Sequence, residues 1–322
     1  MARARPRVDA RGGPCFLPRM RLRFASKVCL VVVLAGCASR QEQGPESPDQ
    51  FVREMPPASE IRNLRTGETV TEQELLGDLL SARVVYLGES HDETMDHAMQ
   101  YRLLRLLYAQ DPALAVGMEM FQEPFQPALD LWSRGELDEV ALRTRTEWDD
   151  RWGFDIRHYR PLLEMVRAHG IPFWALNAPR ELTRAVARGG FEGLTDEQRA
   201  QLPEHLGIDD PAHRAMFNEA MADHPHAHDA AALDRLYQAQ VVWDATMARN
   251  VGRGLAAGAS RMIVLAGSMH VRAGLGIPKR AEASGGRPYR VVLPVDADDA
   301  DAIEALVEAD PRPADYLWIW SD

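Results

Sequence analysis

The chain has 322 residues, of which 46% are hydrophobic and 26% are charged, which is typical of folded globular proteins and excludes a disordered or fibrous chain. Its formal net charge is −11, and it is −18 without residues 1–36, which hold eight Lys or Arg and one Asp. So acidic a chain lacks the basic footprint of nucleic-acid-binding proteins. The three cysteines, at positions 15, 29 and 37, all precede the expected folded part, which excludes a disulfide framework, a thiolate zinc site and a cysteine nucleophile there.

The first 36 residues have the pattern of a secretion signal. The stretch "MRLRFASKVCLVVVLAGCAS" has basic residues, then an apolar run from Val28 to Ala35 that is too short to cross a bilayer, then Leu34-Ala35-Gly36-Cys37. This ending resembles the lipobox of bacterial lipoproteins, in which Cys37 is the acylated first residue of the mature chain. We predict a lipoprotein signal peptide over 1–36, with translation starting at Met1 or at Met20, and a chain anchored in the bacterial cell envelope at the outer membrane. An ordinary secretory signal with an incidental Cys37 is the alternative.

Residues 37–58 are polar and contain Pro and Gly, as in a flexible tether, so we expect one domain over 59–322. Thr71 and Glu74 have the spacing of a capping box, which predicts a short helix ending at Leu80. Apolar periodicity and continuous apolar runs then predict strands and helices in alternation. The strands are "RVVYLGE", "ALAVGMEMF", "IPFWALN", "MIVLAG" and "YRVVLPV", with "YLWIW" as an edge strand; the helices cover 92–110, 126–134, 157–169, a stretch after Pro179, and most of 195–256.

Alternating strands and helices are typical of an α/β fold, with a central, mostly parallel sheet and helices on both faces. Residues 195–256 interrupt this alternation with helices alone. Because strands on both sides of this stretch belong to one predicted sheet, we expect a helical insertion that forms a lid on a single domain.

Polar side chains follow three of the predicted strands. His91 comes three residues after Gly88, His270 comes three residues after Gly267, and Glu119 follows the buried run "AVGM". Because ligands bind at the carboxyl ends of parallel strands, we expect these side chains to share one crevice. Two imidazoles and a carboxylate suit a divalent metal that activates a bound water, and Glu89 would then be the general base. Alternatively, each side chain only caps a loop.

The motifs "YLGESHD", "GMEMF", "AQVVWDATMA" and "LAGSMHVRAGLGIPKR" resemble the ChaN-like haem-binding lipoproteins of the Tiki and TraB superfamily, which also includes erythromycin esterases. The resemblance covers about residues 60–295. It implies that His91, His270 and Glu119 form the polar site, which some relatives use for metal-dependent proteolysis or esterase chemistry. For the ChaN-like branch it implies haem binding, iron uptake, homodimers that enclose haem, and a tyrosine as the iron ligand.

The tyrosine ligand is not matched to one position by these motifs. Tyr86 in a buried strand and Tyr101 on a helix are expected to pack in the core. Tyr159 and His158 lie in the loop-rich "WGFDIRHYRP" and are therefore our candidates for exposed haem ligands, together with His91, His270 and Arg272. A further cluster, His224, His226 and His228, is either a metal- or haem-contacting loop or a solvated one.

The interpretation that we favour is a lipid-anchored haem-binding protein in haem or iron uptake, and not an enzyme. The alternative is a metal-dependent hydrolase, protease-like or esterase-like, with His91, Glu119 and His270 as ligands of a divalent metal ion. A structural lipoprotein with a vestigial site would bind neither haem nor metal.

Overall fold

The computed structural model describes residues 57–222, 225 and 229–321. The predicted signal peptide, Cys37, nearly all of the tether, and His224, His226 and His228 lie outside these residues. Among the described residues, no helix has both the length and the apolar character needed to span a membrane.

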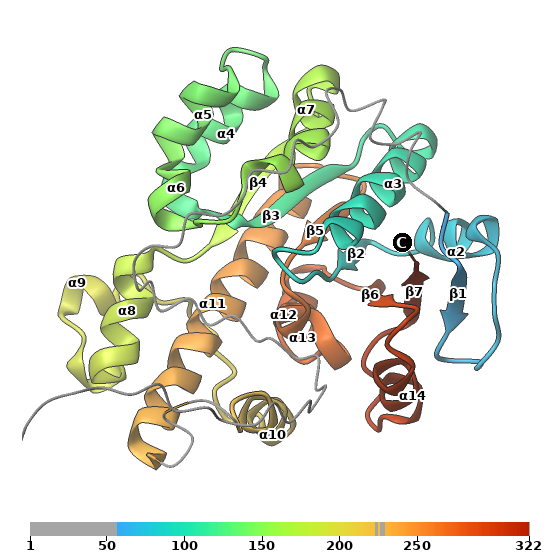
Figure 1. Cartoon of the computed structure of the whole chain (residues 1–322). Coiled ribbons are helices and arrows are strands. Elements are labelled where there is room, and N and C mark those ends of the chain that lie inside the picture. Colours follow the sequence, from blue (N-terminus) through green and yellow to red (C-terminus); the bar gives the residue numbers. More distant parts are fainter. Residues whose placement is uncertain (1–56, 223–224, 226–228, 322) are drawn as a thin grey trace, which may run out of the picture.

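A seven-stranded sheet forms the centre of the molecule (Figure 1). The strand order is β1-β7-β6-β2-β5-β3-β4, and every neighbouring pair is parallel except β1 and β7. The mostly parallel α/β sheet predicted from the sequence is therefore confirmed. The strands are β1 (Glu60–Asn63), β2 (Val84–Leu87), β3 (Ala115–Gln122), β4 (Phe173–Asn177), β5 (Met262–Leu265), β6 (Tyr289–Asp296) and β7 (Tyr316–Trp320).

Helices cover both faces of this sheet. The α-helices of the described residues are α2 (Glu72–Leu79), α3 (Thr94–Gln110), α4 (Gln126–Ser133), α5 (Glu139–Thr146), α6 (Trp148–Arg151), α7 (Arg160–His169), α8 (Arg180–Gly189), α9 (Asp196–Arg199), α10 (Pro211–Ala220), α11 (Ala230–Ala256), α12 (Ser268–Val271), α13 (Ile277–Ala281) and α14 (Ala300–Glu308). Short 3-10 helices are η1 (Glu123–Phe125), η2 (Ile156–His158), η3 (Phe191–Gly193), η4 (Arg272–Gly274) and η5 (Glu282–Ser284).

The pleat of β2 shows how the two faces are filled. Val85 and Leu87 point into a core built with α2, α3, α4, α5 and α7, whereas Val84 and Tyr86 point into a second core built with α11, α12 and α13. Successive strand residues point to opposite faces, so a strand covered on both sides needs a continuous apolar run. This explains why "VVYL" has no polar residue and why all eight residues of β3 are buried.

Two details of the sheet differ from the sequence prediction. "YLWIW" forms β7 but is not an edge strand, because it lies between β6 and the short β1, which takes the edge. We predicted no strand at residues 60–63, since "EIRN" alternates over only four residues and buries just Ile61 and Asn63. The capping box at Thr71 and Glu74 is present and begins α2.

The helical stretch at 195–256 consists of α9, α10 and the 27-residue α11. α11 packs along the second face of the sheet, and α10 lies beside it, close to α12 and α13 (Figure 1). This arrangement places the insertion next to the strand ends that carry the candidate site.

Candidate functional site

The carboxyl ends of β2, β5 and β3, which are neighbours in the sheet, carry the polar residues singled out in the sequence. Glu89 and His91 follow β2, Glu119 lies within β3, and His270 lies on α12 just after β5. Glu119 Oε1 is 3.2 Å from His270 Nε2, and Glu119 Oε2 accepts a 2.7 Å hydrogen bond from the backbone N–H of Gly267. We call Glu89, His91, Glu119 and His270 the strand-end site.

His270 is held between two buried carboxylates. Its Nδ1 donates to Asp244 Oδ1 at 2.6 Å, and its Nε2 faces Glu119. Burial alone would lower the pKa of His270, but the charges of Glu119 and Asp244 outweigh burial and raise this pKa to about 10. Burial would likewise raise the pKa of Glu119, but the His270 charge lowers it to about 2. At neutral pH the two residues therefore form an ion pair with His270 as an imidazolium.

His91 has one engaged and one open ring nitrogen. Its Nδ1 donates to Glu89 Oε1 at 2.7 Å, while its Nε2 has no hydrogen-bond partner among the described residues. Burial would lower the pKa of His91, but the hydrogen bond to Glu89 and the charge of Glu119 raise it on balance. A carboxylate on Nδ1 fixes the ring and makes Nε2 more basic, as it does in catalytic and metal-bound histidines.

Glu89 lies on the buried side of His91 and does not reach solvent. Its side chain has 0% exposure, and it accepts hydrogen bonds from Tyr159 Oη at 2.8 Å and from Gln100 Nε2 at 2.9 Å. Burial would raise the pKa of Glu89, but the charge of His97 and the bond from His91 lower it. Glu89 is therefore a buried carboxylate that orients His91, and a base that must reach solvent at this site would be His91 itself.

The glycines of the two Gly-x-x-His motifs provide space for the site. Gly267 has φ −51°, so its backbone would tolerate a side chain. A Cβ there would lie 2.8 Å from His91 Cε1 and 3.5 Å from Glu119 Oε2. A Cβ at Gly88 would lie 2.5 Å from Leu293 Cδ2. Neither glycine adopts a positive φ, so both serve the close packing of neighbouring protein groups.

Two half-buried rings pack against His91. Trp152 and Phe154 have ring centroids 4.6 and 5.1 Å from that of His91. His158 is half-buried nearby, with its ring tilted against that of His97 at a centroid distance of 5.3 Å, and burial lowers its pKa. Trp152, Phe154 and His158 form an aromatic rim beside the strand-end site.

The described residues contain no group of three His, Cys, Asp or Glu side chains arranged to hold a metal ion. His91, Glu119 and His270 do lie together, but both ring nitrogens of His270 face carboxylates. Asp244 on Nδ1 is the kind of outer-shell carboxylate that orients a metal-bound histidine, so His270 would bind a metal through Nε2 only after losing the proton that faces Glu119.

The residues expected to bind haem differ in how exposed their side chains are. The expectation that Tyr159 is exposed is wrong, because its side chain is 1% exposed and its hydroxyl donates to Glu89. His158 remains partly accessible, and its Nε2 has no hydrogen-bond partner among the described residues. Arg272 is half-buried, and burial lowers its pKa. None of the seven tyrosines is exposed; Tyr108 and Tyr289 are half-buried, and Tyr86, Tyr101, Tyr159, Tyr237 and Tyr316 are buried.

Sequence reasoning missed Asp244 and Gln240, which contact Nδ1 of His270, and His213, which lies beside Asp244. Asp244 and Gln240 are one helical turn apart on α11, within the apolar run "AQVVWDATMA". Two polar residues at i and i+4 on the buried face of a helix were the available signal, because buried polar groups need partners. His213 carried no such signal, since one histidine among the mixed apolar and polar residues of α10 does not mark a buried polar site.

Known proteins resemble this chain in sequence and in fold. A family model described as "Haem-binding uptake, Tiki superfamily, ChaN" matches residues 75–281, which include the whole strand-end site. A solved structure of Campylobacter jejuni, "Cofacial heme binding to ChaN", aligns with a TM-score of 0.64 at 19% identity, covering 80% of this chain and 95% of that one. The chloroplastic protein RETICULATA-RELATED 5 of Arabidopsis thaliana is 24% identical over an alignment 264 residues long, which covers 74% of this chain but only 34% of that protein.

Proposed function

Since this chain belongs to the ChaN family of haem-binding uptake proteins in the Tiki superfamily, we propose that it is a lipid-anchored haem-binding protein of the bacterial cell envelope that serves haem or iron uptake. The observation that carries the proposal is the family match over 75–281, the segment that folds into the strand-end site and its insertion. In this proposal haem is the cargo and the chain is a carrier rather than an enzyme.

The residues present suit haem in several respects. A ferric haem iron takes an imidazole or a phenolate as axial ligand. His91 and His158 each have an Nε2 without a hydrogen-bond partner among the described residues, and the half-buried rings of Trp152 and Phe154 offer apolar surface for a porphyrin. Tyr159 does not suit the iron in this arrangement, because its phenol is bound to Glu89.

Arg272 is half-buried and is our candidate for binding the haem propionates. It follows His270 by two residues, and no ion pair joins it to an acid within the described part of the chain. An unpaired guanidinium favours a carboxylate ligand because it can form two parallel hydrogen bonds with it.

The lipobox at residues 34–37 supports the anchoring part of the proposal. Acyl chains on Cys37, followed by a polar tether, would hold the folded domain beside the outer membrane. The homodimer expected from the family resemblance belongs to the same proposal, since a second copy would enclose the haem between two aromatic rims.

An absorbance titration of the full chain in detergent with ferric haem tests the proposal. We expect a saturable Soret shift at a defined stoichiometry, weakened by His158→Ala or His91→Ala and unaffected by His205→Ala, since His205 is exposed and outside the site. Binding that never saturates, or that is equal in all four proteins, would reject a haem site here.

A second candidate function, hydrolysis, is favoured by the pairing of His91 with Glu89. A histidine with a carboxylate on Nδ1 and an open Nε2 is the arrangement of a general base. The metal-dependent version requires His270 to lose its Nε2 proton and to share the metal with Glu119. Turnover of p-nitrophenyl acetate separates the versions. Activity that is lost in His91→Gln but survives a chelator supports a metal-free base, activity that needs a divalent ion supports the metal enzyme, and no activity rejects both.

A further inference from the structure

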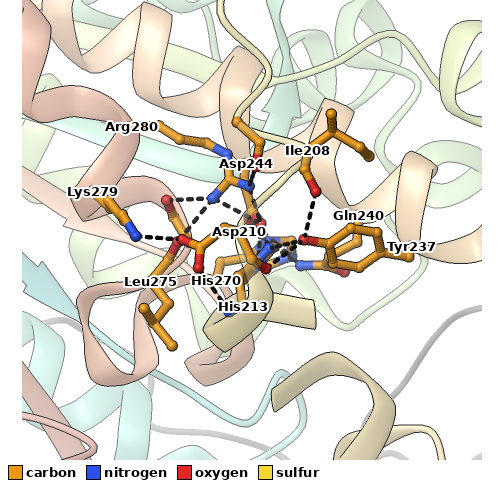
Figure 2. A network of polar contacts seen from close by, with 12 residues as sticks. Ile208, Asp210, His213, Tyr237, Gln240, Asp244, His270, Leu275, Lys279 and Arg280 are labelled. Atoms are coloured by element: carbon orange, nitrogen blue, oxygen red, sulfur yellow. Dashed lines mark hydrogen bonds and ion pairs between the residues drawn. The ribbon is translucent and has the colours of Figure 1, made fainter. Parts of the chain in front are cut away.

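A buried polar network surrounds His270, one of the four residues of the strand-end site, and joins it to residues of α10, α11 and α13 (Figure 2). Asp244 of α11 is its centre, with a side chain that is 0% exposed. One carboxylate oxygen, Oδ1, accepts from His270 Nδ1 at 2.6 Å. The other, Oδ2, lies 3.0 Å from Nε2 of His213, which comes from α10. The same carboxylate therefore contacts the site through Oδ1 and the insertion through Oδ2.

His213, like His270, is buried and has polar partners on both ring nitrogens. Its side chain is 1% exposed, and its Nδ1 lies 3.1 Å from the hydroxyl of Tyr237 and 3.3 Å from an amino group of Arg280. We call His213, Asp244 and His270 the inner relay. The relay spans three elements, α10, α11 and α12, that are distant in sequence.

Two basic residues of α13, Lys279 and Arg280, bind the segment that precedes α10. Arg280 donates to the carbonyl oxygens of Leu206 and Gly207 at 2.9 and 3.1 Å. Lys279 Nζ lies 2.6 Å from Asp210 Oδ2, and Asp210 caps α10 by accepting from the backbone N–H of His213. The position of His213 therefore follows the docked position of this segment.

We propose that Asp244 is a positioning residue that holds the His270 ring toward Glu119, and that His213 makes this orientation depend on the docking of α10. The physical reason is that each Asp244 oxygen has an imidazole as its nearest partner, while Gln240 Nε2 and Arg280 Nη1 lie farther off, at 3.5 Å from Oδ1 and 4.0 Å from Oδ2. A buried carboxylate that loses a partner at 3.0 Å shifts toward its remaining partners, because an unpaired buried charge is costly. When α10 undocks from α11 and α13, the Asp244 carboxylate is free to turn away from His270. The His270 ring then loses its contact with Asp244 Oδ1.

This inference goes beyond the proposed function and does not depend on it, because it concerns how the site is held and not what it binds. It also differs from a general stabilising role of α10. Arg214, the next residue on α10, lies 3.6 Å over the Tyr237 ring and pairs with Asp234 at 2.7 Å. It joins α10 to α11 without contacting Asp244, and so it provides a matched control.

The test is the imidazole N–H spectrum of the full chain with ¹⁵N-labelled histidines, ten in all, with the His270 Nδ1–H signal assigned from His270→Gln. We expect this signal to be protected from solvent exchange in the wild type. His213→Met, which removes the donor and keeps a similar volume, should abolish it. His213→Gln, which keeps a donor, should largely restore it, and Arg214→Ala should leave it unchanged.

Tyr237→Phe is a second variant in case His213→Met does not fold. It removes only the hydroxyl behind His213 and should increase the exchange of the His270 signal with solvent. A His270 signal that is unchanged in His213→Met or in Tyr237→Phe would overturn the proposal. Equal loss of the signal in Arg214→Ala would overturn it too, because any loosening of α10 would then suffice.

Discussion

The free energy of unfolding should fall above about pH 8, because His270 keeps a proton that the unfolded chain releases. The folded-state pKa of His270 is raised from 6.5 to about 10: burial opposes this shift, and the charges of Glu119 and Asp244 outweigh burial. The folded state therefore binds one more proton between these two values. This stabilisation is complete below pH 6.5 and is lost as the pH rises through 10.

The size of the effect follows from the pKa difference. One extra bound proton changes the free energy of unfolding by about 1.4 kcal/mol per pH unit, so the loss between about pH 8 and about pH 9.5 is about 2 kcal/mol. The window starts at pH 8 because burial also raises the pKa of Asp96, to about 8, and this group adds a loss of its own at lower pH.

Urea unfolding across this window measures the slope directly. His270→Gln should be less stable at pH 8, since it leaves Asp244 and Glu119 without their cationic partner, but its stability should fall less steeply with pH, because only the raised pKa of His91 then contributes a loss of the same sign. His205→Gln is the control, because His205 is exposed. If His270→Gln loses stability with pH as steeply as the wild type, His270 is not the imidazolium that we describe.

Three further predictions concern neighbouring parts of the molecule. Glu89→Gln removes a buried charge that His91 contacts at 2.7 Å; it should cost about 3 kcal/mol in urea unfolding at neutral pH, and a cost near zero would contradict this packing. Gly88→Ala places a Cβ 2.5 Å from Leu293 Cδ2, so its melting temperature should fall, whereas an unchanged value would show that the core yields there. Cys37→Ser should release the chain from the membrane fraction, and continued membrane retention would reject the lipid anchor.

The sequence was sufficient to predict most of the sheet, because strands covered on both faces have continuous apolar runs. "VVYL", "AVGM" and "MIVL" are such runs, and all three became neighbouring strands. β1 was missed because four residues at an edge carry too little pattern, and β7 was misplaced because its neighbour was the missing strand.

The candidate site could be predicted only in part, since a sequence shows spacing but not partners. The Gly-x-x-His motifs indicated His91 and His270, and their strands brought them to one end of the sheet. Nothing in the chain indicated that the ring of His270 lies between Glu119 and Asp244, because Asp244 comes from a helix that could present any face. Tyr159 was expected to be exposed because its loop is polar, yet its phenol turns inward to satisfy the buried Glu89.

The central claim is that the strand-end site binds haem, and Gly267→Ala tests it most directly. The added methyl would lie 2.8 Å from His91 Cε1 in a backbone that tolerates alanine, so it disturbs the site without straining the fold. Gly77→Ala is the matched control, since a Cβ there has no neighbour within 4 Å. We would titrate the full-length wild type and both variants with ferric haem. The account predicts saturable binding by the wild type and Gly77→Ala, with at least about tenfold weaker binding by Gly267→Ala. Equal binding by all three proteins would place the haem elsewhere.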